Sequence, residues 1–247
     1  MTVECLPGFV PDWPMPASVR AWVTTRGTGN AADGPYAGFN LGAHVGDAYD
    51  RVVANRARLA KELGCEPVWM NQVHGTCWVD LADAHAGVAA DAALVRRPGR
   101  ACVVMSADCL PVLLCDRAGS VVAAAHAGWR GLADGVLERV VAAMGVPSGD
   151  VLAYLAPAIS ASHYEVGDDV RQRFVAHNSQ LAAAFQCNGR ARFQCDLYGV
   201  ARLRLAALGI AAVFGGDECT FADGKRFYSY RRDGVTGRIA SLIWLND

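Results

Sequence analysis

The sequence predicts an α+β fold, or an irregular α/β fold, in a single domain over residues 1–247, with a mixed central sheet flanked by helices. Short β-rich runs and amphipathic helical segments alternate along the chain without a regular βαβ rhythm. A chain of 247 residues can bury about three quarters of its unfolded surface around one core. No internal repeat, low-complexity tract or linker-like run divides it.

The first half of the chain is expected to hold a strand, a long loop, a helix and then a series of strands. A strand from Val19 ends at Thr24-Thr25-Arg26, and the Gly-rich and Ala-rich stretch 27–46 indicates a loop. Apolar residues at helical spacing predict a helix over 47–63, and Gly64 follows it as a helix-ending glycine. Five β-rich runs come next, at 68–70, 76–81, 101–106, 112–115 and 121–125.

The second half is expected to be mostly helical before it returns to strands. Helices are predicted over 132–144, 168–177 and 196–208. Asp196 is typical of a helix N-cap, and Gly209 is typical of a helix end. Two final strands are predicted at 212–214 and 239–245.

Composition excludes several classes of partner. With 23 Lys and Arg against 24 Asp and Glu, the net charge of -1 gives no field to gather nucleic acid or anionic lipid, so a small-molecule partner is expected. Although 53% of residues are hydrophobic, no run of about 18 apolar residues lacks a charge, so no membrane span is expected. Nine cysteines without a C-x-x-C pair, and a start without signal-peptide features, predict a cytoplasmic protein.

Three short segments place a metal-capable side chain beside turn residues at the end of an apolar strand. They are Asn71-Gln72-Val73-His74-Gly75-Thr76, Ser106-Ala107-Asp108-Cys109-Leu110-Pro111 and Ala125-His126-Ala127-Gly128-Trp129-Arg130-Gly131. The Gly or Pro that follows ends the strand, so each side chain can point into a cleft. Two imidazoles and a thiolate suit Zn²⁺, and three protein ligands leave a fourth position for a reactive water. Because the segments lie far apart in the sequence, ordinary buried polar residues remain the alternative.

These segments resemble the laccase-domain family, which is also described as multicopper polyphenol oxidase and as a zinc-dependent purine nucleoside phosphorylase and adenosine deaminase family. The resemblance runs from Thr24-Thr25-Arg26 to Ser229-Tyr230-Arg231-Arg232-Asp233-Gly234 and covers nearly the whole chain. It implies that His74, Cys109 and His126 are catalytic and hold one zinc ion. It also implies purine nucleosides (adenosine, inosine, guanosine or methylthioadenosine) and phosphate as substrates. One loop departs from the family's Gly-Gly-x-Ser type, because this chain has Gly27-Thr28-Gly29-Asn30-Ala31-Ala32 there.

A phosphorylase also has to hold an anion, and three arginines are candidates for that role. They are Arg26 at the end of a strand, Arg130 at the start of a helix and Arg231 in Tyr230-Arg231-Arg232. We rank Arg26 first because the resemblance also covers it. Further substrate contacts are expected from Asn71, Gln72 and Asp108. The resemblance also reaches the loop that carries His44, which implies that this histidine lies near the cleft. For the arginines a surface ion pair is the alternative, and for Asn71, Gln72 and Asp108 a cap or turn role.

Other functions stay open on the sequence alone. Six histidines without a His-x-His pair are too few for a four-copper relay, so a laccase-like polyphenol oxidase would need copper in a mononuclear site. A cytoplasmic hydrolase that edits peptidoglycan precursors is a second enzymatic alternative, suggested by some bacterial members of the resembled family. The non-enzymatic alternative is a zinc-stabilised binding module, which would need a fourth protein ligand. The oligomeric state and the preferred nucleoside do not follow from the sequence.

Overall fold

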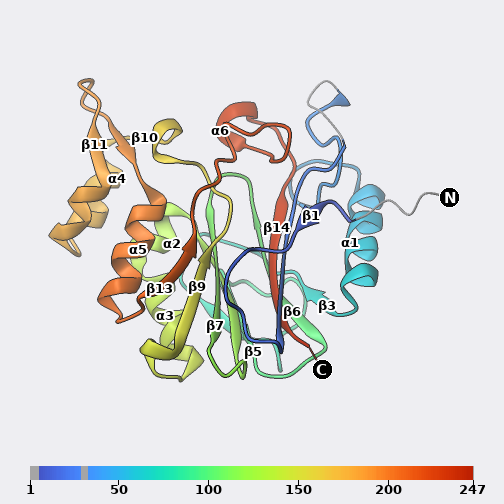
Figure 1. The fold of residues 1–247 in the computed structure, drawn as a ribbon. Helices are drawn as coiled ribbons and strands as arrows, with labels where there is room; N and C mark the ends of the chain where they lie inside the picture. Colours follow the sequence, from blue (N-terminus) through green and yellow to red (C-terminus); the bar gives the residue numbers. More distant parts are fainter. Residues whose placement is uncertain (1–5, 29–32, 247) are drawn as a thin grey trace.

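Two large β-sheets lie face to face in the computed structural model, and helices cover their outer faces (Figure 1). The structure describes residues 6–28 and 33–246. Within these ranges the first sheet holds five strands, in the spatial order β1 (Gly8–Phe9), β2 (Val19–Thr24), β14 (Ile239–Leu245), β6 (Arg100–Ser106) and β3 (Glu66–Val68). The second holds six, in the order β13 (Ala212–Gly215), β9 (Val151–Leu155), β7 (Leu110–Asp116), β8 (Val122–Ala127), β5 (Ala92–Val95) and β4 (Trp78–Asp80).

Both sheets are mixed. In the first, β3 runs parallel to β6 while the other neighbours are antiparallel. In the second, β13 runs parallel to β9 and β4 runs parallel to β5, and the remaining pairs are antiparallel. A small third sheet joins β10 (Glu165–Val166), β12 (Phe193–Cys195) and β11 (Phe185–Cys187).

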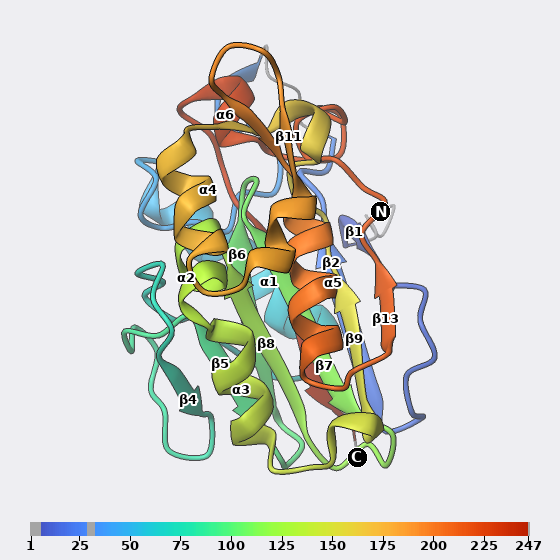
Figure 2. The same cartoon turned by 90° about the vertical axis from the view of Figure 1, so that its left-hand side faces the viewer.

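The helices are divided between the two outer faces (Figure 2). Helix α1 (Tyr49–Leu63) packs on the first sheet, where Leu59 contacts a cluster that includes Val103 and Leu242. On the second sheet lie α2 (Trp129–Asp134), α3 (Val136–Met144) and α5 (Leu197–Ala207), with α4 (Asp168–Val175) beside the third sheet. Short 3-10 turns occur at Ser148–Asp150, Ala161–His163 and Ser179–Ala184, and α6 (Tyr230–Asp233) lies at one end of the sheets.

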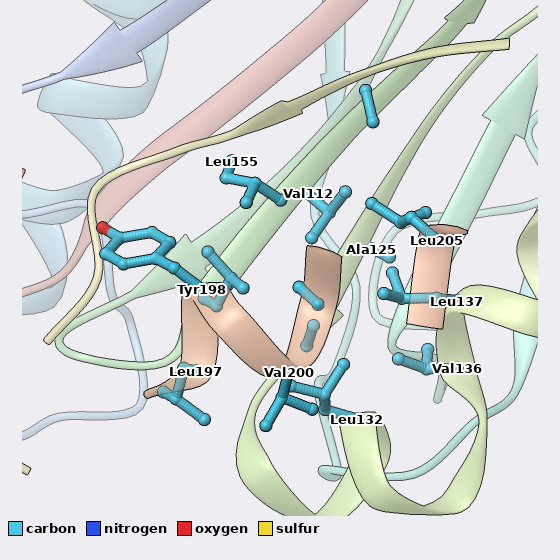
Figure 3. Packing of buried hydrophobic residues seen from close by; sticks show 14 of the residues in the cluster. Val112, Ala125, Leu132, Val136, Leu137, Leu155, Leu197, Tyr198, Val200 and Leu205 are labelled. Atoms are coloured by element: carbon cyan, nitrogen blue, oxygen red, sulfur yellow. The ribbon is translucent and has the colours of Figure 1, made fainter. Parts of the chain in front are cut away.

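Strand residues alternate between two apolar layers, which explains why the central strands are apolar on both faces. On β7, Leu113 faces the first sheet, whereas Val112 faces the helices. Figure 3 shows the second of these layers, in which Val112 and Ala125 pack against Leu137 and other helix residues. The sheet-to-sheet layer and the sheet-to-helix layers together bury the apolar surface of both sheets.

The observed elements confirm the α+β prediction and correct parts of it. The helix predicted over 47–63 is present from Tyr49, but the one predicted over 132–144 is wrong as a single helix. Gly135 has a φ of 96°, a left-handed conformation that ends α2 and starts α3 at an angle. The prediction of one central sheet is also wrong, because the strands divide into two facing sheets. None of the helices in the described parts has the length and apolar character of a membrane span.

Candidate metal centre

The three predicted ligand residues come from different parts of the two sheets. His126 lies on β8 of the second sheet, and His74 lies in the loop after β3 of the first. Cys109 lies in the turn between β6 and β7, where the chain crosses from one sheet to the other. His74 and Asp108 adopt the positive φ values of 60° and 97°, which are uncommon for non-glycine residues. Such strained turns occur preferentially at functional sites.

The structure brings His74, Cys109 and His126 together into a group that can hold a metal ion. One ligand atom from each lies within 4.8 Å of the others, and Cys109 Sγ lies 3.9 Å from His74 Nε2. Tetrahedral zinc would hold such a pair roughly 3.5 Å apart, so small shifts suffice. Gly128 keeps the space open, because an added Cβ would lie 3.0 Å from Cys109 Sγ and 3.2 Å from His74 Cδ2.

A fourth residue, Asp91, holds two of the ligands in place and is absent from the sequence prediction. Its buried carboxylate accepts hydrogen bonds from the backbone N–H groups of Val73, His74 and Gly75. It also lies 2.8 Å from Nδ1 of His126, which leaves Nε2 of that ring for a metal. The available signal was one acidic residue within the apolar run 88–95, because a buried carboxylate requires partners.

The cluster favours a thiolate at Cys109. Burial alone would raise the pKa of this thiol, but hydrogen bonds and charge from His126 and His74 outweigh burial and lower it. Burial likewise opposes protonation of His126, but Asp91 and Cys109 raise the pKa of the imidazole. The thiolate is the form of cysteine that binds metal ions, so the surroundings prepare this side chain as a ligand.

A cavity of about 360 Å³ opens onto the ligand cluster. This volume lies within the usual range for small-molecule sites, which is about 300–1,000 Å³. Besides the three ligands, it is lined by His44, Gln72, Met105, Ser106, Ala107, Tyr230 and Arg238. The structure therefore brings His44 and Gln72, both predicted from the sequence, to the same cavity as the metal-capable group.

The guanidinium of Arg238 is the cation that lines this cavity, and the sequence prediction does not include it. Its Nη1 donates to the backbone oxygens of Thr236 and Gly237, both at 3.0 Å, and the ring of Tyr230 lies 6.0 Å away. Within the described residues, no ion pair with a carboxylate is found for Arg238. Its charge is therefore available to an anion in the cavity.

The other polar side chains around the cluster differ in their protonation, hydrogen bonding and exposure. Burial, followed by the charges of Arg238, Arg56 and His74, lowers the pKa of His44. This ring is therefore neutral at pH 7 and can both donate and accept a hydrogen bond. The side-chain amide of Gln72 exchanges two 2.8 Å hydrogen bonds with the backbone of Met105. Asn71 is exposed and lines a neighbouring hollow that also includes His44.

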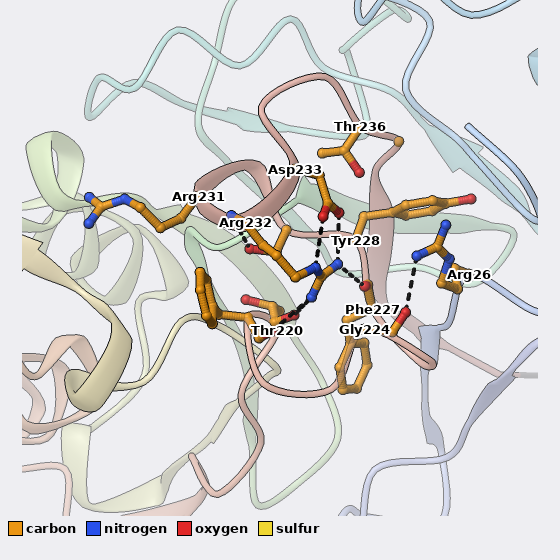
Figure 4. A network of polar contacts seen from close by, with 12 residues as sticks. Arg26, Thr220, Gly224, Phe227, Tyr228, Arg231, Arg232, Asp233 and Thr236 are labelled. Atoms are coloured by element: carbon orange, nitrogen blue, oxygen red, sulfur yellow. Dashed lines mark hydrogen bonds and ion pairs between the residues drawn. The ribbon is translucent and has the colours of Figure 1, made fainter. Parts of the chain in front are cut away.

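Five predicted substrate contacts, Asn71 among them, lie outside this cavity, and their substrate roles stay predictions. Arg26 is only 2% exposed and donates to the oxygen of Gly224 (Figure 4). It lines a different cavity, of about 500 Å³. Arg130 is exposed and lies over the ring of Trp129.

Asp108 and Arg231 are bonded to each other and to the surrounding backbone. The carboxylate of Asp108 accepts from the hydroxyl of Thr220 at 2.6 Å and from the backbone N–H of Arg231 at 2.7 Å. The side chain of Arg231 donates to the oxygen of Glu165. These contacts connect α6 to the turn that carries Cys109.

The loop that departs from the family's Gly-Gly-x-Ser type lies partly outside the described residues, at 29–32.

Known proteins resemble this chain along nearly its whole length. A family model described as multi-copper polyphenol oxidoreductase laccase matches residues 20–246. A purine nucleoside phosphorylase of Pseudomonas aeruginosa is 52% identical over 240 residues, which cover 97% of this chain and 98% of the relative. The purine nucleoside phosphorylase YfiH of Escherichia coli is 48% identical over 240 residues, covering 96% and 98%.

Solved structures share the fold as well. A crystal structure of a Neisseria meningitidis protein matches with a TM-score of 0.94 and 49% sequence identity, covering 97% of this chain and 99% of that chain. The crystal structure of YlmD from Geobacillus stearothermophilus matches with a TM-score of 0.89 and 28% identity, covering 99% and 98%.

Proposed function

We propose that this chain, which belongs to the multi-copper polyphenol oxidoreductase laccase family, is a purine nucleoside phosphorylase with adenosine deaminase activity. Relatives that are about half identical to it over nearly their full length are purine nucleoside phosphorylases. The observation that carries this proposal is the cavity that combines the His74, Cys109 and His126 cluster with the guanidinium of Arg238, which has no carboxylate partner among the described residues. The cluster can activate a substrate group, and the cation can hold a phosphate.

In the phosphorolytic reaction, inorganic phosphate and a purine nucleoside give the free base and a ribose phosphate. The bond between C1′ and the purine nitrogen breaks with its electron pair on the base, and a phosphate oxygen bonds to C1′. Arg238 binds the phosphate through N–H groups that its backbone contacts leave free. Tyr230, whose exposed ring borders the cavity, provides a stacking surface for the purine. His44 can hydrogen-bond the ribose or the base in its neutral form.

The donor set of the cluster fits zinc. One sulfur and two imidazole nitrogens form the borderline-soft set that zinc prefers, and the group in the described residues contains three protein ligands. When bound, zinc would supply Lewis-acid activation of water or of a substrate oxygen. A closed structural site would take four protein ligands, so the observed set favours the enzyme over the binding module.

The deaminase activity uses the same cavity. Water replaces the amino group at C6 of adenosine, which leaves as ammonia, and inosine is the product. Asp91 contributes by fixing the ring of His126 and the backbone of His74, so that the cavity wall keeps its shape during the reaction. The preferred nucleosides are proposed to be adenosine, inosine, guanosine and methylthioadenosine.

A direct assay tests this function. Purified protein is incubated with adenosine, with and without phosphate, and inosine and free bases are measured by chromatography. We expect inosine under both conditions and free base only with phosphate. A Cys109→Ala variant should lose both activities, whereas Cys187→Ala, at an exposed cysteine outside the cavity, should keep them. Neither product above the level of Cys109→Ala would refute the proposal.

A further inference from the structure

A second cluster of reactive side chains surrounds Cys219, apart from the metal centre. Cys219 follows β13 and pairs with Ala158 through an isolated parallel bridge. That bridge places its sulfur against Ser160 and against His163 of the 3-10 turn Ala161–His163. Neither this cysteine nor its neighbours line the cavity at the metal centre.

Hydrogen-bond donors converge on the sulfur of Cys219. The Ser160 hydroxyl donates to Sγ at 3.0 Å, and the backbone N–H of Ser160 donates at 3.4 Å. The backbone N–H groups of Phe221 and Ala222 also act to lower the pKa of this thiol. Nδ1 of His163 lies 3.6 Å from the sulfur, and the ring of Phe221 stacks on this imidazole at 4.6 Å. Such a set of donors stabilises a negative sulfur more than a neutral thiol.

The remaining cysteines provide a contrast within the same chain. Burial raises the pKa of Cys102, Cys115 and Cys195, which keeps them as inert thiols. Burial would also raise the pKa of the Cys219 thiol, but the hydrogen bonds from Ser160 and the backbone outweigh burial and lower this pKa. Cys187 is exposed and serves as the surface thiol for comparison.

We propose that Cys219 is a modification site whose thiolate reacts with hydrogen peroxide or a comparable small oxidant. The sulfur attacks one peroxide oxygen and the O–O bond breaks. The sulfur is oxidised to a sulfenic acid, and the leaving hydroxide takes up a proton and departs as water. The half-buried position of Cys219 admits a small reagent, and the converging donors stabilise the attacking thiolate.

The test compares cysteines inside one protein preparation. The zinc-loaded protein is treated with limiting hydrogen peroxide in the presence of a sulfenic-acid trapping reagent, and each labelled peptide is quantified by mass spectrometry. We expect Cys219 to be labelled several-fold faster than the exposed Cys187, because the Ser160 hydroxyl and backbone N–H that donate to its sulfur stabilise the attacking thiolate. Equal or slower labelling of Cys219 would overturn the proposal.

Two serine variants separate the donor effect from general disturbance. Ser160→Ala removes the 3.0 Å donor to the sulfur, whereas Ser162→Ala removes a hydroxyl that contacts His163 and the Ser160 hydroxyl but not Cys219. Iodoacetamide labelling of Cys219 across pH 5–9 should shift to higher pH in Ser160→Ala and stay close to wild type in Ser162→Ala. Nucleoside assays and circular dichroism confirm that both variants fold. An unchanged pH profile in a folded Ser160→Ala would contradict the role of the donors.

Discussion

Asp91 shows how one buried carboxylate can position two candidate metal ligands. It connects the turn that carries His74 to the imidazole of His126. We expect Asp91→Asn to weaken zinc binding about 10-fold to 100-fold, as is usual when a group that orients a ligand is removed. Competition with a chelating dye measures the affinity.

A buried carboxylate elsewhere in the chain provides the matched control for Asp91. Asp116→Asn changes a residue that is also buried, and whose carboxylate accepts hydrogen bonds from Ser120 and Val121 of its own turn. This variant should keep the wild-type zinc affinity. Equal affinity in Asp91→Asn and wild type would show that the carboxylate does not position the ligands.

Arg238 and Arg130 offer a second comparison, between a cavity arginine and a surface arginine. Arg238→Gln should raise the KM for phosphate about tenfold or more, because a charge-assisted hydrogen bond contributes about 1.5–3 kcal/mol. Arg130→Gln alters an exposed guanidinium that lies on Trp129 and should leave this KM unchanged. Steady-state kinetics with phosphate varied at saturating inosine measure both. A larger rise in the KM for phosphate in Arg130→Gln than in Arg238→Gln would indicate that phosphate binds at the start of α2 instead.

At the level of elements, the entry to α2 explains why glycine stands beside the metal centre. Gly128 precedes this helix, and a Cβ there would crowd Cys109 and His74. Gly128→Ala should therefore weaken zinc binding at least about tenfold while the fold is kept, because a contact of 3.0 Å forces the ligands apart. Gly149→Ala is the control, since nothing lies within 4 Å of its added Cβ. Dye competition on the two variants reports the difference, and equal affinities would contradict the steric argument.

The turn between β7 and β8 contributes a pH-dependent part of stability. Burial alone would raise the pKa of Asp116, but hydrogen bonds from Ser120 and Val121 outweigh it and lower the pKa. A carboxyl whose pKa is lower in the folded state stabilises the fold above the pKa of the unfolded chain, near 4. This contribution is lost as the pH falls through the lower, folded value.

Urea unfolding across pH tests that contribution. Replacing Asp116 by Asn should reduce the free energy of unfolding by about 1–2 kcal/mol at pH 6–7. The difference between variant and wild type should shrink steadily as the pH is lowered below about 4. A difference that stays constant from pH 7 to pH 3 would show that the ionised carboxylate is not the cause.

The sequence was most informative where a signal was local. Helical spacing and Gly64 located α1, and turn residues beside strands identified His74, Cys109 and His126, which the structure brings together. Residues that reach the site only through tertiary packing could not be predicted from such local signals. Arg238 directly precedes the last strand, β14. Only the packing of α6 and of the loop before β14 brings it to the cavity.

Long-range pairing also explains the missed architecture of the whole molecule. A strand buried on both faces has the same apolar pattern whether it belongs to one central sheet or to two facing sheets. The pairing of the C-terminal strand β14 with the N-terminal strand β2, and with β6 from the middle of the chain, is what separates the first sheet from the second. Such pairing depends on tertiary contacts, and no periodicity within one segment reports it.

The candidate metal centre takes its side chains from both sheets, which predicts that metal binding stabilises the entire fold. His74 follows a strand of the first sheet, His126 belongs to the second, and Cys109 lies in the connection. A shared ion would link the layers, and the unfolded chain holds the ligands too far apart to bind it well. At a free zinc concentration 100-fold above Kd, this linkage is worth about 2.7 kcal/mol.

Thermal unfolding should therefore respond to zinc. Chelation should lower the Tm of the wild-type protein, and added zinc should restore it, by several degrees for a chain of this size. Cys109→Ser removes the soft ligand and should lose most of this response, whereas Cys187→Ser, at an exposed thiol, should keep it. Differential scanning fluorimetry with zinc buffered by a chelator measures all three proteins. A wild-type Tm that does not change with zinc would mean that the three side chains do not bind the ion as a unit, because binding only to the folded state necessarily stabilises it.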